Sequence, residues 1–396
     1  MTDKNLSLKK LKEEFILQYG ESENEIIIAA APARINIIGE HIDYNGGLVF
    51  PAAINLFLFI ALRKRSDRKI IYKTKREKKL FEFFIDDNFK FESKNSFANY
   101  LNGMLKFLKE EGLNITCGFE VLISSDIPAG SGLSSSAALE SGFGTAVCSI
   151  FNFKIDGITL AKIGKRVEND FLGLKSGIMD QFAITMGKEN NAILLNTSSL
   201  EYKYIPLNIE PYKIAVMNSN KPRKLTESKY NERKAECEKA LAYLQQNKQI
   251  KFLCELNFKD YKEAEPQLKN NCSEAIAKRV RHCVTESERV AKAVEALKQN
   301  DLKLCGKLLC ESHISLKEDY EVTGKELDSL FFAAIKQEGC LGARMTGAGF
   351  SGCAIAIVHK DCFTQFAQSV GKIYKAETGL TASFFPCSIA NGAAVL

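Results

Sequence analysis

Residues 127–140 read IPAGSGLSSSAALE, a run of glycines and serines followed by small apolar residues. Gly130 and Gly132 leave no side chain at points where the backbone must approach a ligand closely. The small residues that follow predict a buried helix over 134–151, whose positive end and free N–H groups would face the loop. The segment therefore predicts an anion-binding loop, and a simple turn capping a core helix is the alternative. Its hydroxyls come from Ser131, Ser134, Ser135 and Ser136.

Two common nucleotide-binding motifs do not account for the glycines of this chain. No Gly-Lys-Ser or Gly-Lys-Thr follows the first glycines, so the loop is not a P-loop. Residues 347–352, GAGFSG, fit the spacing GxGxxG, but the apolar run CAIAIV after them indicates a strand. A dinucleotide-binding turn needs a helix at that place. Residues 347–352 are therefore either a glycine loop packed against phosphates or a tight connection between strands.

Polar side chains are dense in residues 32–47, PARINIIGEHIDYNGG. Sugar hydroxyls need donors and acceptors in fixed directions, and a site built for them rejects analogues that lack a hydroxyl. This composition favours a sugar-binding loop. The alternatives are a structural role for the histidine and loop capping for the two acids. The side chains concerned are Arg34, Glu40, His41, Asp43, Tyr44 and Asn45.

Two further acidic residues stand out by their surroundings. Glu168 lies in KRVENDF, and Asp180 lies in SGIMDQF. Asp180 could be a catalytic carboxylate, but it could also be only the N-cap of a helix over QFAITM. Glu168 taken alone is typical of a solvated carboxylate on a helix.

Composition is that of a soluble globular protein from a reducing compartment. The chain has 396 residues, 45% of them hydrophobic, which suits roughly two domains. Its first residues are polar, and its longest apolar run, near residues 52–62, is far shorter than the ~20 residues of a membrane helix. The 12 cysteines form no CxxC pair, which predicts reduced thiols rather than disulfides or a metal site. We therefore expect a cytoplasmic protein without a membrane partner.

The net charge of +6 is too small to indicate a nucleic-acid binder. Basic residues gather in 63–79, RKRSDRKIIYKTKREKK. This stretch is either a targeting signal or phosphate-binding patch, or a solvated strand pair whose lysines protect a sheet edge. We favour the strand pair and expect no nucleic-acid partner.

Hydrophobic periodicity predicts helices mixed with strands in both halves of the chain. Dense charge at helical spacing indicates a helical region over 227–335. Residues 206–212 are a candidate crossover, so we expect domains over 1–205 and 206–396 with a cleft between them. The other expected helices are 7–19, 96–111 and 158–169, and the expected strands are 25–31, 48–62, a pair within 81–91, 117–125, 194–205, 213–218, 342–359 and 380–386.

Taken together, the glycine-containing segments resemble the motifs of the galactokinase family, in the family's order. The patterns GRxNxIGEHxDYNxG, PxGxGLSSSAxLE and RMTGGGFGG are similar to residues 33–47, 128–140 and 344–352. The resemblance extends from about residue 25 to the C-terminus. It includes the blocks ANYLNGM (98–104), GIMDQF (177–182), RHCVTESERV (281–290) and ESHISLKEDYEVTGKELD (311–328).

Departures from the family pattern leave the charged groups in place. Ala33 stands where the family has glycine before the arginine, and the third motif reads GAGFSG. SKYNERK lacks the proline that often follows its tyrosine. The chain also has no tryptophan, the residue that the family often places near the adenine.

The resemblance implies an α+β, two-domain GHMP kinase fold, with an N-terminal domain of the ribosomal protein S5 domain 2-like type and a ferredoxin-like C-terminal domain. It also implies transfer of the γ-phosphoryl group of ATP to the anomeric hydroxyl of galactose with Mg²⁺, and we expect a monomer. A kinase for a related sugar, such as N-acetylgalactosamine or arabinose, is the first alternative. The second is a non-catalytic galactose sensor, although such sensors lose serine-loop residues that are intact here.

Residue by residue, the resemblance implies roles for the polar positions. Asp180 is similar to the base that accepts the C1 hydroxyl proton or orients that oxygen, and Arg34 to the arginine on the transferring phosphate. Sugar contacts are implied for Glu40, His41, Asp43, Gly177 and Tyr230. The ATP phosphate loop would comprise Gly130, Ser131, Gly132, Leu133, Ser134, Ser135 and Ser136, with Phe97 near the adenine. The magnesium ligands would be Ser136 and Glu168.

Overall fold

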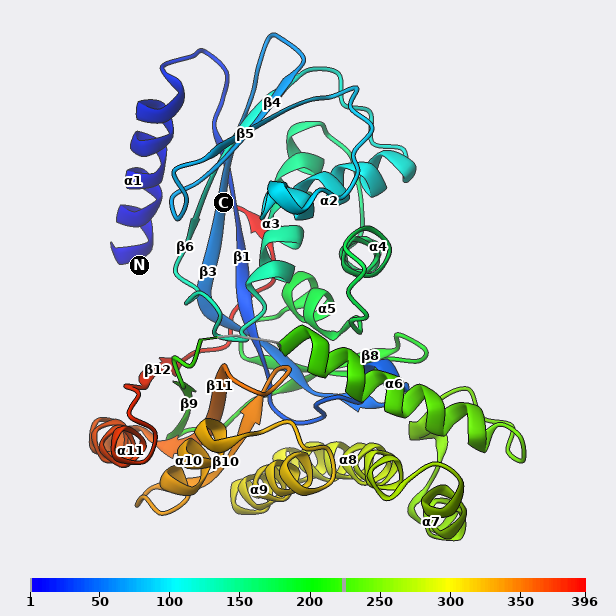
Figure 1. Ribbon diagram of the computed structural model, residues 1–396. Helices are drawn as coiled ribbons and strands as arrows, with labels where there is room; N and C mark the ends of the chain where they lie inside the picture. The colour runs from blue at the N-terminus through cyan, green and yellow to red at the C-terminus, as the bar shows by residue number, and fades with distance from the viewer. Residues whose placement is uncertain (1, 223–225) are drawn as a thin grey trace.

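The computed structural model describes residues 2–222 and 226–396, which form an upper and a lower part in the view of Figure 1. The upper part is built on a six-stranded sheet with strand order β13-β1-β3-β6-β4-β5. Neighbouring strands run antiparallel, except that β4 and β6 are parallel. The strands are β1 (Ile27–Asn36), β3 (Pro51–Lys64), β4 (Lys69–Thr74), β5 (Leu80–Phe84), β6 (Phe119–Ser125) and β13 (Ala394–Val395).

Helices cover both faces of the upper sheet because side chains alternate between the faces of each strand. Ile28 of β1 belongs to a small core with Phe15 of α1, whereas Ala31 of β1 belongs to the main core on the other face. α3 lies close to the sheet on that face, since a Cβ at Gly142 would be only 3.1 Å from the Cβ of Ala31. The helices are α1 (Thr2–Tyr19), α2 (Ala98–Glu110), α3 (Ser135–Ile150), α4 (Gly157–Arg166) and α5 (Met179–Met186).

The lower part contains a four-stranded antiparallel sheet with strand order β10-β11-β9-β12. Figure 1 shows α10 and α11 beside this sheet, α7, α8 and α9 along the bottom of the molecule, and α6 above α8. Its strands are β9 (Tyr212–Asn218), β10 (Cys340–Thr346), β11 (Cys353–His359) and β12 (Ser383–Cys387). Its helices are α6 (Thr226–Leu244), α7 (Phe258–Asn271), α8 (Glu274–Lys298), α9 (Leu302–Glu318), α10 (Lys325–Ala334) and α11 (Phe363–Thr378).

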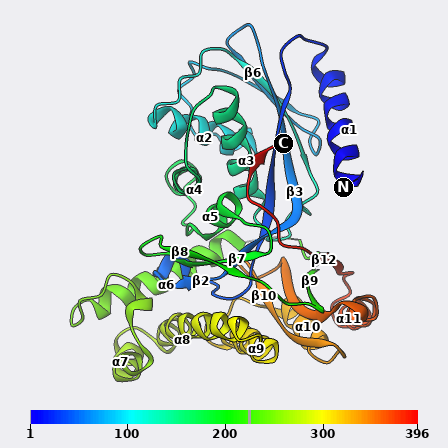
Figure 2. The same ribbon diagram turned by 180° about the vertical axis from the view of Figure 1, so that it is seen from behind.

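A small sheet and the C-terminal segment connect the two parts. The small sheet has strand order β2-β7-β8, with β2 (Leu48–Val49), β7 (Asn191–Asn196) and β8 (Tyr202–Pro206). In the view from behind, the C-terminal segment runs from β12 up to the first sheet (Figure 2). There Ala394 pairs with Ala30 of β1. Residues 394–395, which the expected boundary assigns to the second domain, thus complete the first sheet.

The structure corrects several element boundaries. Residues 85–91 are not a strand: β5 ends at Phe84, Asp87 accepts from the Phe84 N–H, and Phe89 turns back into the core. The helix expected over 158–169 is α-helical only to Arg166 and continues as a π-helical turn, Val167–Phe171. The strand expected over 194–205 is a hairpin of β7 and β8, and the strand expected over 25–31 extends to Asn36.

Both parts mix strands with helices, so the α+β class is confirmed. The basic stretch lies largely on β4 and its flanks, where Lys69 pairs with Glu82 and Arg68 pairs with Asp86. These ion pairs agree with the strand interpretation of that stretch. Within residues 2–222 and 226–396, none of the helices combines the length and the apolar character needed to cross a membrane.

Candidate active site

A cavity of about 740 Å³ brings the sequence motifs together. Residues from the polar segment, the glycine-serine loop and the third glycine motif all reach its walls. This convergence joins positions more than 300 residues apart, such as Arg34 and Gly347. The lining residues are Arg34, Glu40, His41, Asp43, Tyr100, Gly130, Gly132, Ser134, Ser135, Ser136, Glu168, Leu174, Lys175, Ser176, Gly177, Met179, Asp180, Tyr230, Asn231, Gly347 and Ala348.

An ion pair between Arg34 of β1 and Asp180 of α5 lies at the wall of this cavity. Arg34 donates from Nε to Oδ1 and from Nη2 to Oδ2 of Asp180, both at 2.7 Å. Ser134 also donates to Asp180 Oδ2. Burial opposes the charge of Arg34, but Asp180 outweighs it and raises the arginine pKa. The pair therefore holds a permanent cation and a carboxylate side by side.

The alternative that Asp180 is only a helix cap is wrong. The N-cap of α5 is Ile178, so Asp180 lies within the first turn and makes its contacts with side chains outside the helix. Arg34 is almost fully buried, whereas the Asp180 side chain keeps 31% of its exposure. The carboxylate is thus open to a molecule in the cavity while the arginine fixes its orientation.

The glycine-serine loop has the geometry of an anion-binding loop. Gly130 and Gly132 have φ values of 67° and 77°, in the left-handed region that suits glycine. Ser134, also left-handed, precedes α3 and makes no side-chain cap, so the first N–H groups of the helix are left to other partners. The Gly132 carbonyl accepts from Nη1 of Arg34 at 2.8 Å, which ties the loop to the ion pair.

Two members of the predicted phosphate loop do not line the cavity. Leu133 is fully buried, and its backbone carbonyl accepts from the N–H of Arg34 at 3.3 Å. Ser131 is 2% exposed. Gly130, Gly132, Ser134, Ser135 and Ser136 do line it. The role of all seven in nucleotide binding stays a prediction.

Ser136 and Glu168 offer oxygen donors for a hard cation. Ser136 Oγ lies 3.3 Å from Glu168 Oε1, which the π-helical turn after α4 carries to the cavity. Burial raises the pKa of Glu168, so a nearby cation would favour its charged form. Among the residues that the structure describes, no cluster of three or more histidine, cysteine or acidic side chains could hold a metal ion. The donor set fits Mg²⁺, which is usually bound by one or two protein ligands together with water and substrate phosphates.

A buried pair behind these residues was not identified from the sequence. Glu140 of α3 accepts from Nε2 of Gln181 at 3.0 Å, and both side chains are fully buried. Burial and the neighbouring Glu168 raise the pKa of Glu140 well above its usual range. Gln181 directly follows Asp180 in the GIMDQF motif, and this position next to a predicted catalytic residue is the sequence feature that could have identified the pair.

The polar segment forms a loop, residues 39–47, which we call the GEH loop. His41 has a left-handed φ of 61°, and its Nδ1 lies 2.9 Å from the hydroxyl of Tyr44. Burial and the nearby His282 lower the His41 pKa to about 3, so the ring is neutral near pH 7. The Tyr230 ring of α6 is centred 5.6 Å from His41 and completes this wall.

Asp43 and Gly177 are in close contact across the cavity. A Cβ at Gly177 would lie 1.8 Å from Asp43 Oδ2, so only glycine leaves room for that carboxylate. Burial, with the negative charges of Asp180 and Glu40, raises the Asp43 pKa to about 7. These two residues, 134 positions apart by their numbers, thus share one small volume.

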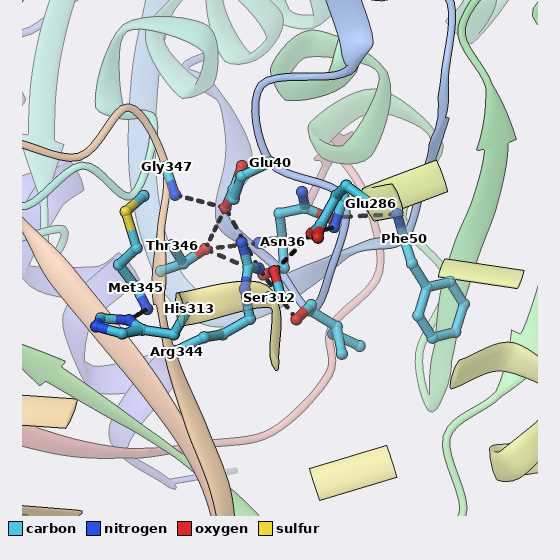
Figure 3. Close-up of polar contacts among 12 residues, drawn as sticks. Asn36, Glu40, Phe50, Glu286, Ser312, His313, Arg344, Met345, Thr346 and Gly347 are labelled. Carbon is cyan, nitrogen blue, oxygen red and sulfur yellow. Dashed lines mark hydrogen bonds and ion pairs between the residues drawn. The ribbon is translucent and has the colours of Figure 1, made fainter. Parts of the chain in front are cut away.

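The Glu40 carboxylate links the GEH loop to the third glycine motif (Figure 3). Its Oε1 accepts from the Gly347 N–H at 2.6 Å and lies 3.1 Å from Thr346 Oγ1 and 3.6 Å from Arg344 Nη1. Residues 347–352 connect β10 with β11, as the strand-connection interpretation requires. A Cβ at Gly347 would lie 2.8 Å from the Gly132 carbonyl oxygen, so this connection also touches the glycine-serine loop.

Phe97 lies apart from the cavity walls. Its ring packs edge-on against Phe81, with ring centroids 5.2 Å apart. Tyr100, one turn further along the same chain segment, lines the cavity instead. The sequence offered no signal to distinguish these two aromatic residues, and the adenine contact of Phe97 stays a prediction.

Known proteins match nearly the whole length of this chain. Residues 99–188 match the GHMP kinases N terminal domain, residues 13–64 the galactokinase galactose-binding signature, and residues 293–376 the GHMP kinases C terminal domain. The galactokinase of Ligilactobacillus salivarius is 46% identical over 98% of this chain and 99% of that protein. The galactokinase of Streptococcus suis is 46% identical over 99% of each chain.

Solved structures agree with these matches. The crystal structure of Lactococcus lactis galactokinase complexed with galactose superposes with a TM-score of 0.94, at 43% identity, and covers 98% of this chain and 100% of that one. The Methanococcus jannaschii mevalonate kinase superposes with a TM-score of 0.66 at 21% identity, over 93% of this chain and 100% of that one, which shows a shared fold only.

Proposed function

Since this chain belongs to the galactokinase family of GHMP kinases, we propose that it transfers the γ-phosphoryl group of ATP to the anomeric hydroxyl of D-galactose. The two-domain α+β fold expected from the resemblance is confirmed by the same matches. The observation that carries the proposal is the Arg34–Asp180 pair in a cavity that is also lined by the glycine-serine loop and the GEH loop.

Phosphoryl transfer needs alignment and charge stabilisation more than covalent help from the protein. The N–H groups and hydroxyls of the glycine-serine loop would bind the ATP phosphates at the positive end of α3. Arg34 would stabilise the transferring phosphoryl group. Asp180 would accept the C1 hydroxyl proton or orient that oxygen, because its carboxylate faces the cavity and has a fixed geometry.

Mg²⁺ would be held by Ser136 and Glu168 together with the phosphates. When bound, the ion neutralises charge on the phosphate oxygens and fixes their positions. The two residues supply a hydroxyl and a carboxylate on the phosphate side of the cavity, 3.3 Å apart. The raised pKa of Glu168 suggests that its ionisation and the binding of the cation support each other.

The sugar would lie between the GEH loop and α5. Glu40, His41 and Asp43 supply acceptors and a neutral ring along one wall, and Gly177 and Tyr230 complete the pocket.

The twelve cysteines all lie within the described residues, and none forms a disulfide. Free thiols support our proposal of a cytoplasmic protein, which we propose to be a monomer.

The test is a sugar panel with ATP and Mg²⁺, monitored by ADP release, with the phosphorylated carbon located by NMR. Galactose, N-acetylgalactosamine, arabinose and glucose are compared at equal concentrations. We expect galactose to give the highest kcat/KM and phosphate only on C1. A higher kcat/KM for N-acetylgalactosamine or arabinose would identify a sister kinase, and galactose binding without ADP release would identify a sensor.

A further inference from the structure

Two side chains of helix α8 contact the backbone of two consecutive residues in the GEH loop, Gly39 and Glu40. Glu286 Oε1 accepts from the Gly39 N–H at 2.9 Å. One turn earlier on the same face, His282 Nε2 lies 3.0 Å from the Glu40 carbonyl oxygen, to which it donates. Both side chains are fully buried. His282 and Glu286 belong to the segment RHCVTESERV (281–290), which has no role in the phosphoryl transfer or sugar binding proposed above.

Helix α9 holds the two α8 side chains in place. Ser312 donates to Glu286 Oε1 at 2.6 Å, and Ser315 Oγ lies 2.9 Å from His282 Nδ1. Arg289 donates to the other oxygen of Glu286 at 2.8 Å. We call His282, Glu286, Ser312 and Ser315 the α8–α9 clamp. Ser312 thus backs the Glu286 contact, and Ser315 Oγ, which also lies 3.1 Å from Asp319 Oδ2, is placed to back the His282 contact.

The ionisation states suit these bonds. Burial lowers the His282 pKa to about 4, so the neutral ring can donate from Nε2 and accept at Nδ1. Burial disfavours the charge on Glu286, but Arg289 together with His282, Arg344 and the Ser312 hydrogen bond outweighs burial and brings the Glu286 pKa down to about 2. Near neutral pH the clamp therefore presents one carboxylate acceptor and one N–H donor to the loop.

The GEH loop has little room to move at the clamped position. Gly39 has a φ of +105°, and a Cβ there would lie 2.8 Å from the Leu48 carbonyl oxygen and 3.0 Å from Cγ2 of Val290 on α8. His41 is also left-handed, which a non-glycine residue adopts only when its surroundings enforce it. Figure 3 shows Glu286 and Ser312 close together and the Glu40–Gly347 contact near them.

We propose that Glu286 is a positioning residue for sugar recognition, held in place by Ser312, and that His282 with Ser315 makes the second contact of the same clamp. Glu286 acts through the backbone of Gly39 and fixes the loop that carries Glu40, His41 and Asp43. The inference rests on the proposed function, because it assigns the sugar site to this loop. It extends that function by placing a determinant of sugar affinity on α8, outside the cavity wall.

The first test compares Glu286→Ala with Glu286→Gln. The alanine variant removes the acceptor for Gly39 and Ser312, whereas the glutamine variant keeps one carbonyl oxygen for both. We expect Glu286→Ala to raise the KM for galactose ~10- to 100-fold, the effect seen when residues that orient metal ligands are removed, with the KM for ATP nearly unchanged. Glu286→Gln should recover part of this loss. Equal increases in the two KM values would overturn the proposal.

A milder, matched pair keeps the proposal testable if Glu286→Ala does not fold. Ser312→Ala and Ser329→Ala each delete a buried hydroxyl that donates to a carboxylate at 2.6 Å, but Ser329 bonds Glu377, away from the loop. We expect only Ser312→Ala to weaken the rise in Tm caused by galactose without ATP. If both variants weakened this rise in Tm equally, the effect of Ser312→Ala would reflect a general loss of packing, and the positioning role of the clamp would be wrong.

Assays of the wild-type protein distinguish a failure of the proposed function from a failure of the positioning role of Glu286. If it does not phosphorylate galactose, the proposed function fails. If it does, but Glu286→Ala and Ser312→Ala keep the galactose KM and the galactose-induced rise in Tm of wild type, only the positioning role fails.

Discussion

The substitution Gly177→Ala tests the proposed sugar-binding wall of the cavity, because it adds a single methyl group to the protein. Gly177 has no side chain, and Asp43 uses the space that a Cβ would occupy. In Gly177→Ala the new carbon would lie 1.8 Å from Oδ2 and 2.3 Å from Cγ of Asp43. No charge or hydrogen-bonding group is removed by this substitution, so its effect comes from the displaced carboxylate alone.

The displacement can be worked out from the contact distances. Because real Cβ atoms essentially never lie closer than 3.0 Å to another heavy atom, the Asp43 oxygen must move by roughly 1.2 Å. A carboxylate that no longer reaches its sugar hydroxyl leaves that hydroxyl unpaired, at a cost of ~1–3 kcal/mol. We therefore expect the galactose KM to rise ~5- to 150-fold. Overpacking should also lower the stability by ~1–3 kcal/mol.

The assay measures KM for galactose and for ATP by ADP release, together with Tm. Gly173→Asn is the matched control in the same loop. A Cβ at Gly173 meets no atom within 4 Å, and its φ of +74° is one that asparagine tolerates. We expect Gly177→Ala to raise the galactose KM much more than the ATP KM, and Gly173→Asn to change neither.

A double-mutant cycle with Asp43→Ala gives the refuting result. Asp43→Ala alone should weaken galactose binding by a similar factor, because it deletes the same carboxylate. In that background the alanine at Gly177 has no partner to displace, so the combined effect should be far from additive. A galactose KM close to wild type in Gly177→Ala, or full additivity in the cycle, would refute the reasoning.

Three further predictions concern the chemistry and its pH dependence. Asp180→Asn should lower kcat ~10²- to 10⁴-fold. Arg34→Lys loses the planar fork that binds both carboxylate oxygens, so it should lower kcat ~10³- to 10⁵-fold. The rise in Tm caused by galactose should persist in both variants, and a nearly normal kcat in Asp180→Asn would exclude Asp180 as the base. Glu168→Gln should raise the Mg²⁺ concentration for half-maximal rate at least ~10-fold and leave the galactose KM similar, which a Mg²⁺ titration measures. The third prediction concerns the pH dependence of stability. Because the Asp43 pKa is raised from 3.8 to about 7, the folded protein keeps a proton that the unfolded chain releases, so stability falls as pH rises from 3.8 to about 7. Asp43→Asn should flatten this part of the curve in urea titrations, and an unchanged slope would contradict the shift.

Local patterns in the sequence were enough to predict most of the elements and an anion-binding loop, whereas the resemblance to the galactokinase family implied the phosphoryl transfer. The glycines of the glycine-serine loop, the small residues of α3 and the charged helices of the second half all reflect preferences that act over a few residues. The three motifs in family order were confirmed as those of the galactokinase family by full-length matches. The boundary at residue 205 and the individual site roles stay predictions.

Tertiary structure decided which residues meet. Arg34 and Asp180 are 146 positions apart, and their contact depends on how α5 packs beside β1 within the upper part. Glu286 and Gly39 are 247 positions apart, and their contact depends on how the two parts pack. The same holds for Tyr100, which reaches the cavity where Phe97 does not, and for the π-helical turn that carries Glu168. A sequence specifies local conformation through short-range sterics and hydrogen bonds, whereas the distance between remote side chains is fixed only when buried surfaces of separate elements come together.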